Sequence, residues 1–89
     1  MTSYTTSGFW KAYQRLERAV QRQAREAYRL FEQNPRHPSL HFKRVHIRKA
    51  IYSVRVNLDV RAVAIRGGDE MVWFWIGPQD EYEKLLARL

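Results

Sequence analysis

Residues 52–65 read YSVRVNLDVRAVAI, and this stretch decides the fold. Its first five and last six residues are rich in β-branched side chains and predict two strands, and Asn57-Leu58-Asp59 between them predicts a turn. If the valines beside this turn pair, Arg55 lies directly opposite Arg61 on one sheet face. Like charges there destabilise a sheet, so the pair indicates a functional site. Two guanidinium groups suit a phosphate; the alternatives are a register one residue different, or side chains that splay into water.

Residues 9–31 contain neither glycine nor proline and predict helix, preceded by N-cap hydroxyls at Thr5-Thr6-Ser7. Apolar residues recur at helical spacing and form one stripe: Phe9, Tyr13, Leu16, Val20, Ala24, Ala27 and Phe31. Basic residues recur on the opposite side: Lys11, Arg15, Arg18, Arg22, Arg25 and Arg29. This basic stripe suits a phosphate backbone or an acidic peptide, or is the solvated face of an amphipathic helix.

Pro35 and Pro38 end the helical region. Alternation and turn signals then predict a short strand over residues 40–45, a turn at 67–70, a strand over 71–76 and a closing helix over 80–89. The order of elements predicts an α+β fold, with one or two N-terminal helices, an antiparallel sheet of about four strands and a short C-terminal helix.

Residues 72–76 read VWFWI and do not alternate between apolar and polar side chains. A strand that is apolar on both sides needs cover on both sheet faces. The N-terminal helix covers one face, so the closing helix, a ligand or a partner chain is expected on the other. These aromatic rings suit nucleobase stacking, but core packing is the favoured interpretation for at least two of the three.

The chain carries a formal net charge of +7, which indicates a polyanionic partner, most commonly nucleic acid. Residues 1–66 hold 14 of the 16 Lys and Arg residues but four of the nine acids, a balance of +10, whereas residues 67–89 have a balance of −3. Arginine dominates over lysine, which favours bidentate phosphate contacts. Charge alone does not separate RNA, DNA and an acidic protein partner.

Cysteine is absent, so the sequence excludes disulfides and thiolate chemistry. With no apolar run long enough to span a membrane and no signal-peptide pattern at Met1-Thr2-Ser3-Tyr4, a soluble cytoplasmic protein is expected. His37, His41 and His46 lack metal-ligand spacing, and Gly67-Gly68 lacks the spacing of a phosphate-binding loop, so neither a metal nor a cofactor is expected. The usable polar set is Lys43, Arg44, Arg55, Arg61, Gln79 and Tyr82.

Taken together, these segments resemble the RelE/ParE superfamily of toxins from bacterial type II toxin–antitoxin systems. The resemblance covers nearly the whole length, so residues 1–89 are expected to form a single toxin domain. It rests on Phe9-Trp10, Tyr13, residues 34–43, 52–56, 61–62, 72–77 and Asp80-Glu81-Tyr82. The resemblance implies a helical hairpin with a break near residues 16–18, whereas the sequence alone favours one helix. A single helix would run about 35 Å, long for a domain of this size.

The resemblance further implies a ribosome-dependent mRNA endonuclease that uses no metal and is restrained by a cognate acidic antitoxin. In such a reaction a 2′-hydroxyl attacks its own phosphate, and fixed cations must meet the charge that develops. By family position, Arg55 and Arg61 clamp the phosphate, and Tyr82 is the remaining acid or base because arginine is never deprotonated. Lys43, Arg44 and Gln79 complete the expected RNA-binding set.

Two departures from the family pattern stand out. Relatives commonly have Gly-x-His where this chain has Gly77-Pro78-Gln79, and Tyr-Arg-Ala where it has Val60-Arg61-Ala62. Glutamine orients a substrate but does not exchange a proton at neutral pH, and loss of a general acid or base costs roughly 10²–10⁴-fold in rate. The sequence therefore leaves open an attenuated nuclease and a non-catalytic binding protein. The latter acts on a topoisomerase, as ParE-like proteins do, or pairs with an antitoxin and represses its own promoter.

Overall fold

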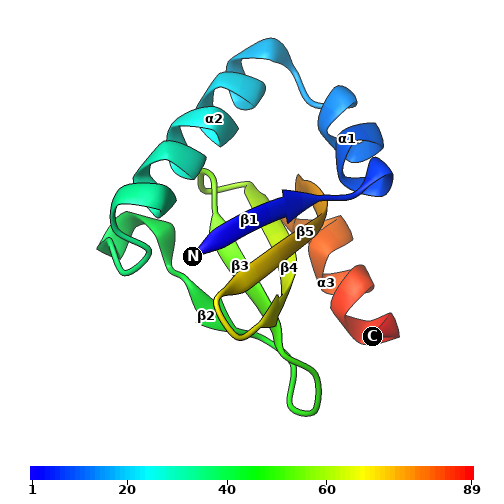
Figure 1. The fold of residues 1–89 in the computed structure, drawn as a ribbon. Helices are drawn as coiled ribbons and strands as arrows, with labels where there is room; N and C mark the ends of the chain where they lie inside the picture. The colour runs from blue at the N-terminus through cyan, green and yellow to red at the C-terminus, as the bar shows by residue number, and fades with distance from the viewer.

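The computed structural model describes all residues, 1–89, and contains a five-stranded mixed sheet packed between helices (Figure 1). The strand order is β1-β5-β4-β3-β2. The elements in chain order are β1 (Thr2–Thr5), α1 (Ser7–Gln14), α2 (Arg18–Gln33), the 3₁₀ helix η1 (Pro38–Leu40), β2 (Lys43–Arg44), β3 (Ile51–Arg55), β4 (Val60–Gly67), β5 (Glu70–Pro78) and α3 (Gln79–Arg88). The predicted α+β class is confirmed.

The strand β1 was not predicted from the sequence. It pairs in parallel with β5, with Thr2 opposite Glu70 and Thr5 opposite Trp73, and it makes the sheet mixed instead of purely antiparallel. The remaining four strands pair antiparallel, as expected. The segment Thr2–Thr5 contains strand-favouring Thr and Tyr but is too short to be assigned from sequence, and it forms β1 by pairing with the edge of β5.

The helical region is a hairpin, so the expectation of one helix is wrong and the break implied by the family resemblance is confirmed. Thr6 caps α1, because its hydroxyl accepts from the backbone N–H of Phe9 at 3.1 Å. After the break, Gln21 of α2 reaches back and donates to the carbonyl of Tyr13 at 3.0 Å. The Thr6 hydroxyl thus satisfies an N–H of the first turn of α1, and Gln21 satisfies a carbonyl at the break.

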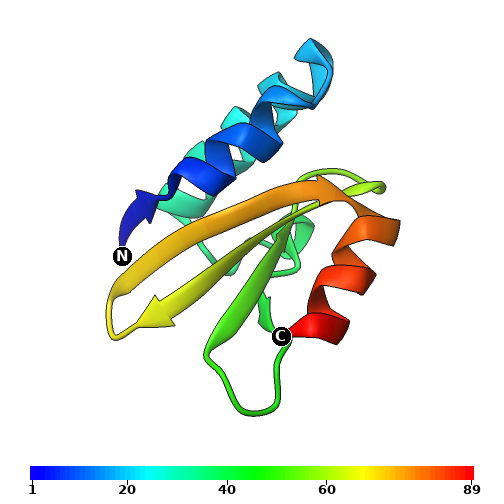
Figure 2. The same cartoon turned by 90° about the vertical axis from the view of Figure 1, so that its right-hand side faces the viewer.

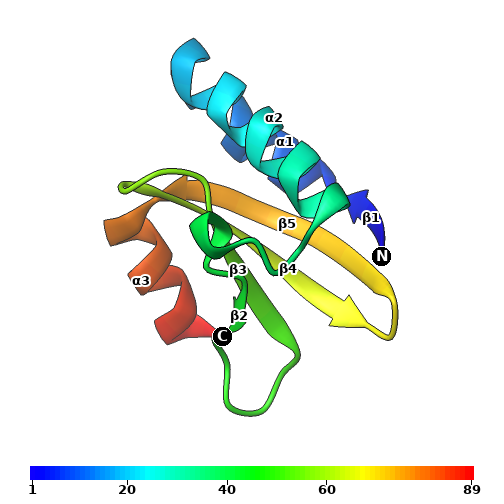
Figure 3. The ribbon, with the colours of Figure 1, turned by 90° about the vertical axis from the view of Figure 1, so that its left-hand side faces the viewer.

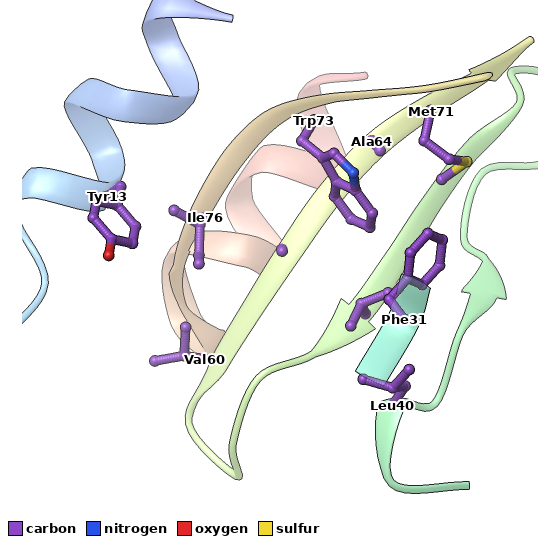
Figure 4. Packing of buried hydrophobic residues seen from close by; sticks show 10 residues of the cluster. Tyr13, Phe31, Leu40, Val60, Ala64, Met71, Trp73 and Ile76 are labelled. Carbon is purple, nitrogen blue, oxygen red and sulfur yellow. The ribbon is translucent and has the colours of Figure 1, made fainter. Parts of the chain in front are cut away.

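The sheet is covered on both faces, as the doubly apolar strand requires. Figures 2 and 3 show the α1–α2 hairpin on one side of the sheet and α3 on the other. The larger core lies under the hairpin, where Phe31 of α2 packs edge-to-face on Trp73 at 5.4 Å between ring centroids (Figure 4). The smaller core lies under α3 and joins Ile51, Val63 and Tyr82. None of the helices is long and apolar enough to cross a membrane.

A bulge in β5 decides on which sheet face each ring of residues 73–75 packs. Val63 pairs with Trp75 and Ala64 pairs with Trp73, which leaves Phe74 as the extra residue. Trp73 therefore belongs to the core under the hairpin, and Phe74 and Trp75 pack against the core under α3. Core packing, the favoured interpretation of these rings, is what the structure shows.

Candidate functional site

The register of the β3–β4 hairpin places Arg55 directly opposite Arg61, as predicted. The turn is closed by the backbone N–H of Val56, which donates to the carbonyl of Val60 at 3.0 Å. Ser53 precedes Arg55 by two residues and contacts Tyr82 of α3. By strand alternation, both arginines belong to the sheet face that α3 covers. Arg55, at the end of β3, also lines a pocket with Arg22 and Glu26 of α2.

Arg61 is held by the turn it follows. Its Nη1 donates to the carbonyls of Asn57 at 2.8 Å, Val60 at 3.2 Å and Leu58 at 3.4 Å. These bonds fix the guanidinium group and order the turn, while Nε and Nη2 have no partner in the protein. A guanidinium group held in this way retains N–H donors for an anion.

Arg55, by contrast, makes no side-chain hydrogen bond and no ion pair. The structure contains one ion pair, between Arg29 and Glu26 at 2.9 Å on the surface of α2. The like-charge pair on the hairpin is therefore not neutralised by any carboxylate. Two neighbouring cations without an acidic partner have the chemistry to bind an anion.

Tyr82 lies in the core under α3 and is 7% exposed. Its hydroxyl donates to Ser53 Oγ at 3.3 Å, and Ser53 is itself 2% exposed. The hydroxyl is thus on the same face as the arginine pair but beneath α3. A substrate atom reaches it only if α3 shifts, so the acid–base role of Tyr82 stays a prediction.

Lys43 and Arg44 lie on opposite faces of the sheet. Lys43 pairs with Ser53 and therefore shares the face of the arginine pair, where it is exposed and unpaired. Arg44 pairs with Tyr52, and its Nε donates to the carbonyls of His46 at 3.1 Å and Lys49 at 3.2 Å. The structure therefore gives Arg44 a loop-ordering contact.

Gln79 is the first residue of α3 and lies beside the β3–β4 hairpin that carries Arg55 and Arg61. Its backbone N–H donates to the carbonyl of Asp59 at 2.7 Å, which joins the start of α3 to the β3–β4 turn. Its side-chain Oε1 is buried and accepts no hydrogen bond. An unpaired buried acceptor costs free energy, so this amide is placed at the site at some expense of stability.

Two of the three histidine side chains accept hydrogen bonds from nearby backbone N–H groups. His37 Nδ1 accepts from the N–H of Ser39, and His46 Nδ1 accepts from two N–H groups in the next turn. His41 ends η1 with a left-handed φ of 46°. No three His, Asp or Glu side chains lie together in a way that would hold a metal ion.

A second candidate site is a groove of about 770 Å³ between the α1–α2 hairpin and the sheet, on the face opposite the arginine pair. Its lining is mostly apolar and includes the exposed rings of Tyr4, Trp10 and Tyr28. Arg25, Arg29 and Glu32 supply charge at its wall. Partial burial, and then the neighbouring Glu32 carboxylate, raise the pKa of Tyr28 above its ordinary value.

Comparison with known families identifies the class of protein. A model described as the ParE-like toxin domain matches residues 18–84. The chain belongs to the ParE-like toxin family. The toxin has no match among curated protein sequences.

Solved toxin structures share its fold. YafQ from E. coli strain BL21(DE3) is 12% identical with a TM-score of 0.73, covering 90% of this chain and 94% of that one. RelE of the archaeal RelE–RelB complex from Pyrococcus horikoshii OT3 is 17% identical with a TM-score of 0.69, covering 88% and 93%. The YoeB/ParE toxin from Agrobacterium tumefaciens is 15% identical with a TM-score of 0.67, covering 89% and 99%. At these identities the likeness establishes the fold alone.

Sequence reasoning missed the groove of this toxin. The apolar stripe over residues 9–31 packs against the core under the hairpin, but the break at residues 15–17 divides it between two helices, and a groove remains between them and the sheet. The same break divides the basic stripe: Lys11 lies on α1, Arg15 follows it, and the other four arginines lie on α2. The stripe is therefore not one continuous surface. Aromatic residues at exposed positions of the helix pattern were the available signal.

Proposed function

We propose that this toxin cleaves mRNA on the ribosome without a metal ion, and that an acidic antitoxin restrains it. The observation that carries the proposal is the pair of Arg55 and Arg61, which share one sheet face with no carboxylate partner. Lys43 extends the cationic surface along the same face. The net charge of +7 agrees with a polyanionic substrate.

In the proposed reaction the 2′-hydroxyl of a nucleotide attacks the adjacent phosphorus, and the bond to the 5′ oxygen of the next nucleotide breaks. One proton leaves the attacking hydroxyl and one is delivered to the departing oxygen, which gives a 2′,3′-cyclic phosphate and a 5′-hydroxyl end. Arg55 and Arg61 stabilise the charge on the phosphoryl oxygens. Gln79 orients the nucleotide and Tyr82 is the candidate proton carrier. Since Tyr82 is buried and glutamine transfers no proton, we expect slow cleavage.

The antitoxin proposal rests on the groove under the helical hairpin. Its apolar lining suits the apolar face of an amphipathic helix, and Arg25 and Arg29 beside it suit acidic residues on that helix. Solved relatives include RelE in complex with RelB, which supports a partner of this kind. Gln79 and the buried Tyr82 favour the second candidate, a non-catalytic member that binds a topoisomerase or only its antitoxin.

The experiment that decides between them is cleavage of mRNA bound to purified ribosomes, read by primer extension. Arg55→Ala and Arg61→Ala are each expected to reduce the cleavage rate by about 10²–10³-fold, as loss of a fixed oxyanion donor does. Arg18→Ala, an exposed arginine at the start of α2, is the matched control and should cleave at the parent rate. Cleavage that persists in both Arg55→Ala and Arg61→Ala would contradict the proposed site. No cleavage by the parent chain would favour the non-catalytic alternative.

A further inference from the structure

The segment between β2 and β3, residues 45–50, forms a loop that projects from the end of the sheet away from the α1–α2 hairpin (Figures 1, 2 and 3). We call it the basic loop. Ile47 at its tip is 93% exposed, the largest exposure of any large apolar side chain in the protein. Arg48 and Lys49, which follow, are also exposed.

The basic loop is ordered from within. The Nε of Arg44 donates to the carbonyls of His46 and Lys49, and His46 Nδ1 accepts from the backbone N–H groups of Arg48 at 3.1 Å and Lys49 at 3.0 Å. At its base, the backbone N–H of Val45 donates to the carbonyl of Ile51, and the backbone N–H of Arg66 donates to the carbonyl of Ala50, each at 2.8 Å. The fold therefore uses specific contacts to hold Ile47 out in solvent. A single exposed apolar residue is ordinary, but one presented on a self-ordered loop is not explained by the fold.

The charge around the loop has one sign. Residues 33–58 contain no Asp or Glu, and the exposed cations near the tip are Lys43, Arg44, Arg48 and Lys49. None of them forms an ion pair. An apolar tip flanked by unpaired cations suits a nucleic-acid groove, where an aliphatic side chain contacts base edges or wedges between bases and the cations meet phosphates on either side.

The loop is separate from the arginine pair. β3 joins the basic loop at Ile51 to Arg55 at its far end, and four steps of about 3.3 Å place these residues roughly 13 Å apart. One phosphate cannot serve both places. One aliphatic tip also buries too little area to hold a protein partner or a membrane by itself.

We infer that the basic loop is an RNA-docking element that inserts Ile47 into the shallow minor groove of an RNA helix while Arg48 and Lys49 contact its phosphates. The wide, shallow minor groove of A-form RNA is open to such a tip. The inference rests on the proposed function in one respect, because the ribosome is the source of RNA helices. Docking on a helix by this loop would leave the arginine pair free for the single-stranded message.

The test measures binding of a fluorescein-labelled 16-base-pair RNA duplex by fluorescence anisotropy over a salt series. The full chain carries Arg55→Ala so that cleavage and toxicity do not interfere. In this background Ile47→Ser should weaken binding at least fivefold without changing the salt dependence. The double change Arg48→Glu with Lys49→Glu should weaken binding and reduce the salt slope by about two, one for each lost phosphate contact.

Matched controls lie elsewhere on the molecule. Leu58→Ser removes another exposed apolar side chain, 74% exposed, from the β3–β4 turn. Arg15→Glu with Arg18→Glu makes the same change of net charge at the α1–α2 turn. Both should bind within twofold of the parent. Equal losses in the two charge-reversal variants would reduce the effect to general electrostatics and overturn the inference, as would Ile47→Ser binding at parent strength.

Three further outcomes separate this inference from its alternatives. If RNA binding depends on the basic loop but the natural chain, with Arg55 intact, does not cleave mRNA on ribosomes, the inference stands and the nuclease proposal is wrong. If Ile47→Ser changes neither mRNA cleavage nor duplex binding, the inference is wrong and the nuclease proposal stands. If Ile47→Ser leaves RNA binding intact but abolishes binding to vesicles of anionic phosphatidylglycerol, the loop contacts a membrane surface and the inference is wrong.

Discussion

Arg55 and Arg61 face each other across one hairpin but differ in what their guanidinium groups contact. Arg61 donates to three carbonyls of the turn, whereas Arg55 has no protein partner. One arginine therefore supports the local structure and carries charge, and the other carries charge alone. Substitutions at the two positions should separate these contributions.

Arg55→Ala is expected to raise the free energy of unfolding by about 0.2–1 kcal/mol, because it relieves like-charge repulsion across the strands. Arg61→Ala relieves the same repulsion but removes the donor to the turn carbonyls, so we expect a net loss of about 1 kcal/mol. Urea denaturation followed by tryptophan fluorescence measures both. Equal stabilisation by the two changes would show that the turn contacts of Arg61 contribute nothing.

A substitution at Gln79 tests whether proton transfer limits the rate of mRNA cleavage by the toxin. Gln79→His is expected to raise cleavage of ribosome-bound mRNA, because a histidine at this position supplies the group that glutamine lacks. The rate should then follow a titration near pH 6.5, about the unperturbed histidine value.

Tyr82→Phe in the natural chain is the paired control. It should remove the residual cleavage and cost about 0.5–1.5 kcal/mol of stability through the lost bond to Ser53. Strong cleavage by the natural protein that persists in Tyr82→Phe would place the acid–base chemistry on other residues.

At the scale of elements, β5 depends on a glycine beside its bulge. A Cβ at Gly77 would lie 2.5 Å from the Trp75 ring, so the ring folds over a position that only glycine provides. Arg61 pairs with Gly77, which places this packing next to the candidate site.

Gly77→Ala is expected to destabilise the fold by about 1–3 kcal/mol, because overpacking forces the Trp75 ring out of its position. Gly67→Ala is the matched control, since nothing lies within 4 Å of a Cβ at that position. Thermal unfolding by circular dichroism compares the two. A Gly77→Ala protein as stable as Gly67→Ala would mean that the ring moves at no cost.

The α1–α2 break also makes a stability prediction. Glu17 has φ −62° and ψ 153°, which proline adopts, and its backbone N–H makes no backbone hydrogen bond. Glu17→Pro should therefore stabilise the protein by about 0.4–1 kcal/mol by restricting the unfolded chain. The same substitution at Arg22, inside α2, should be strongly destabilising. A loss of stability at Glu17 would imply that the turn needs freedom that proline removes.

At the scale of the whole molecule, the two candidate sites occupy opposite faces of the sheet. The arginine pair lies on the α3 side, and the groove lies under the helical hairpin. Arg61 lies outside the lining of the groove, so direct inhibition at Arg61 requires a second antitoxin segment that passes around a sheet edge.

If an acidic reading frame neighbours the gene, its co-expression should give a tight complex, and the association rate should fall with salt because charge steers the encounter. Tyr28→Ser, which removes a ring from the groove, should raise the dissociation rate about tenfold or more if the groove holds the partner. Surface plasmon resonance measures both rates. Separate elution of the two proteins at moderate salt would rule out the complex.

The sequence by itself determined the β3–β4 hairpin, the strand that needs cover on both faces and the closing helix. These follow from short-range patterns: β-branched runs around a turn and an apolar run bounded by turn residues. The sequence left two registers open for this hairpin, and the backbone bond between Val56 and Val60 selects the one that pairs Arg55 with Arg61.

Only the tertiary structure decided the rest. β1 forms because β5 has a free edge with which it pairs. The helix breaks at residues 15–17 because both halves must pack on one small sheet, although residues 15–17 contain no glycine or proline. The burial of Tyr82 and the ordering of the basic loop by Arg44 also depend on contacts between elements. Local propensity specifies which segments form, and the free energy of packing them together decides where they end and which side chains remain exposed.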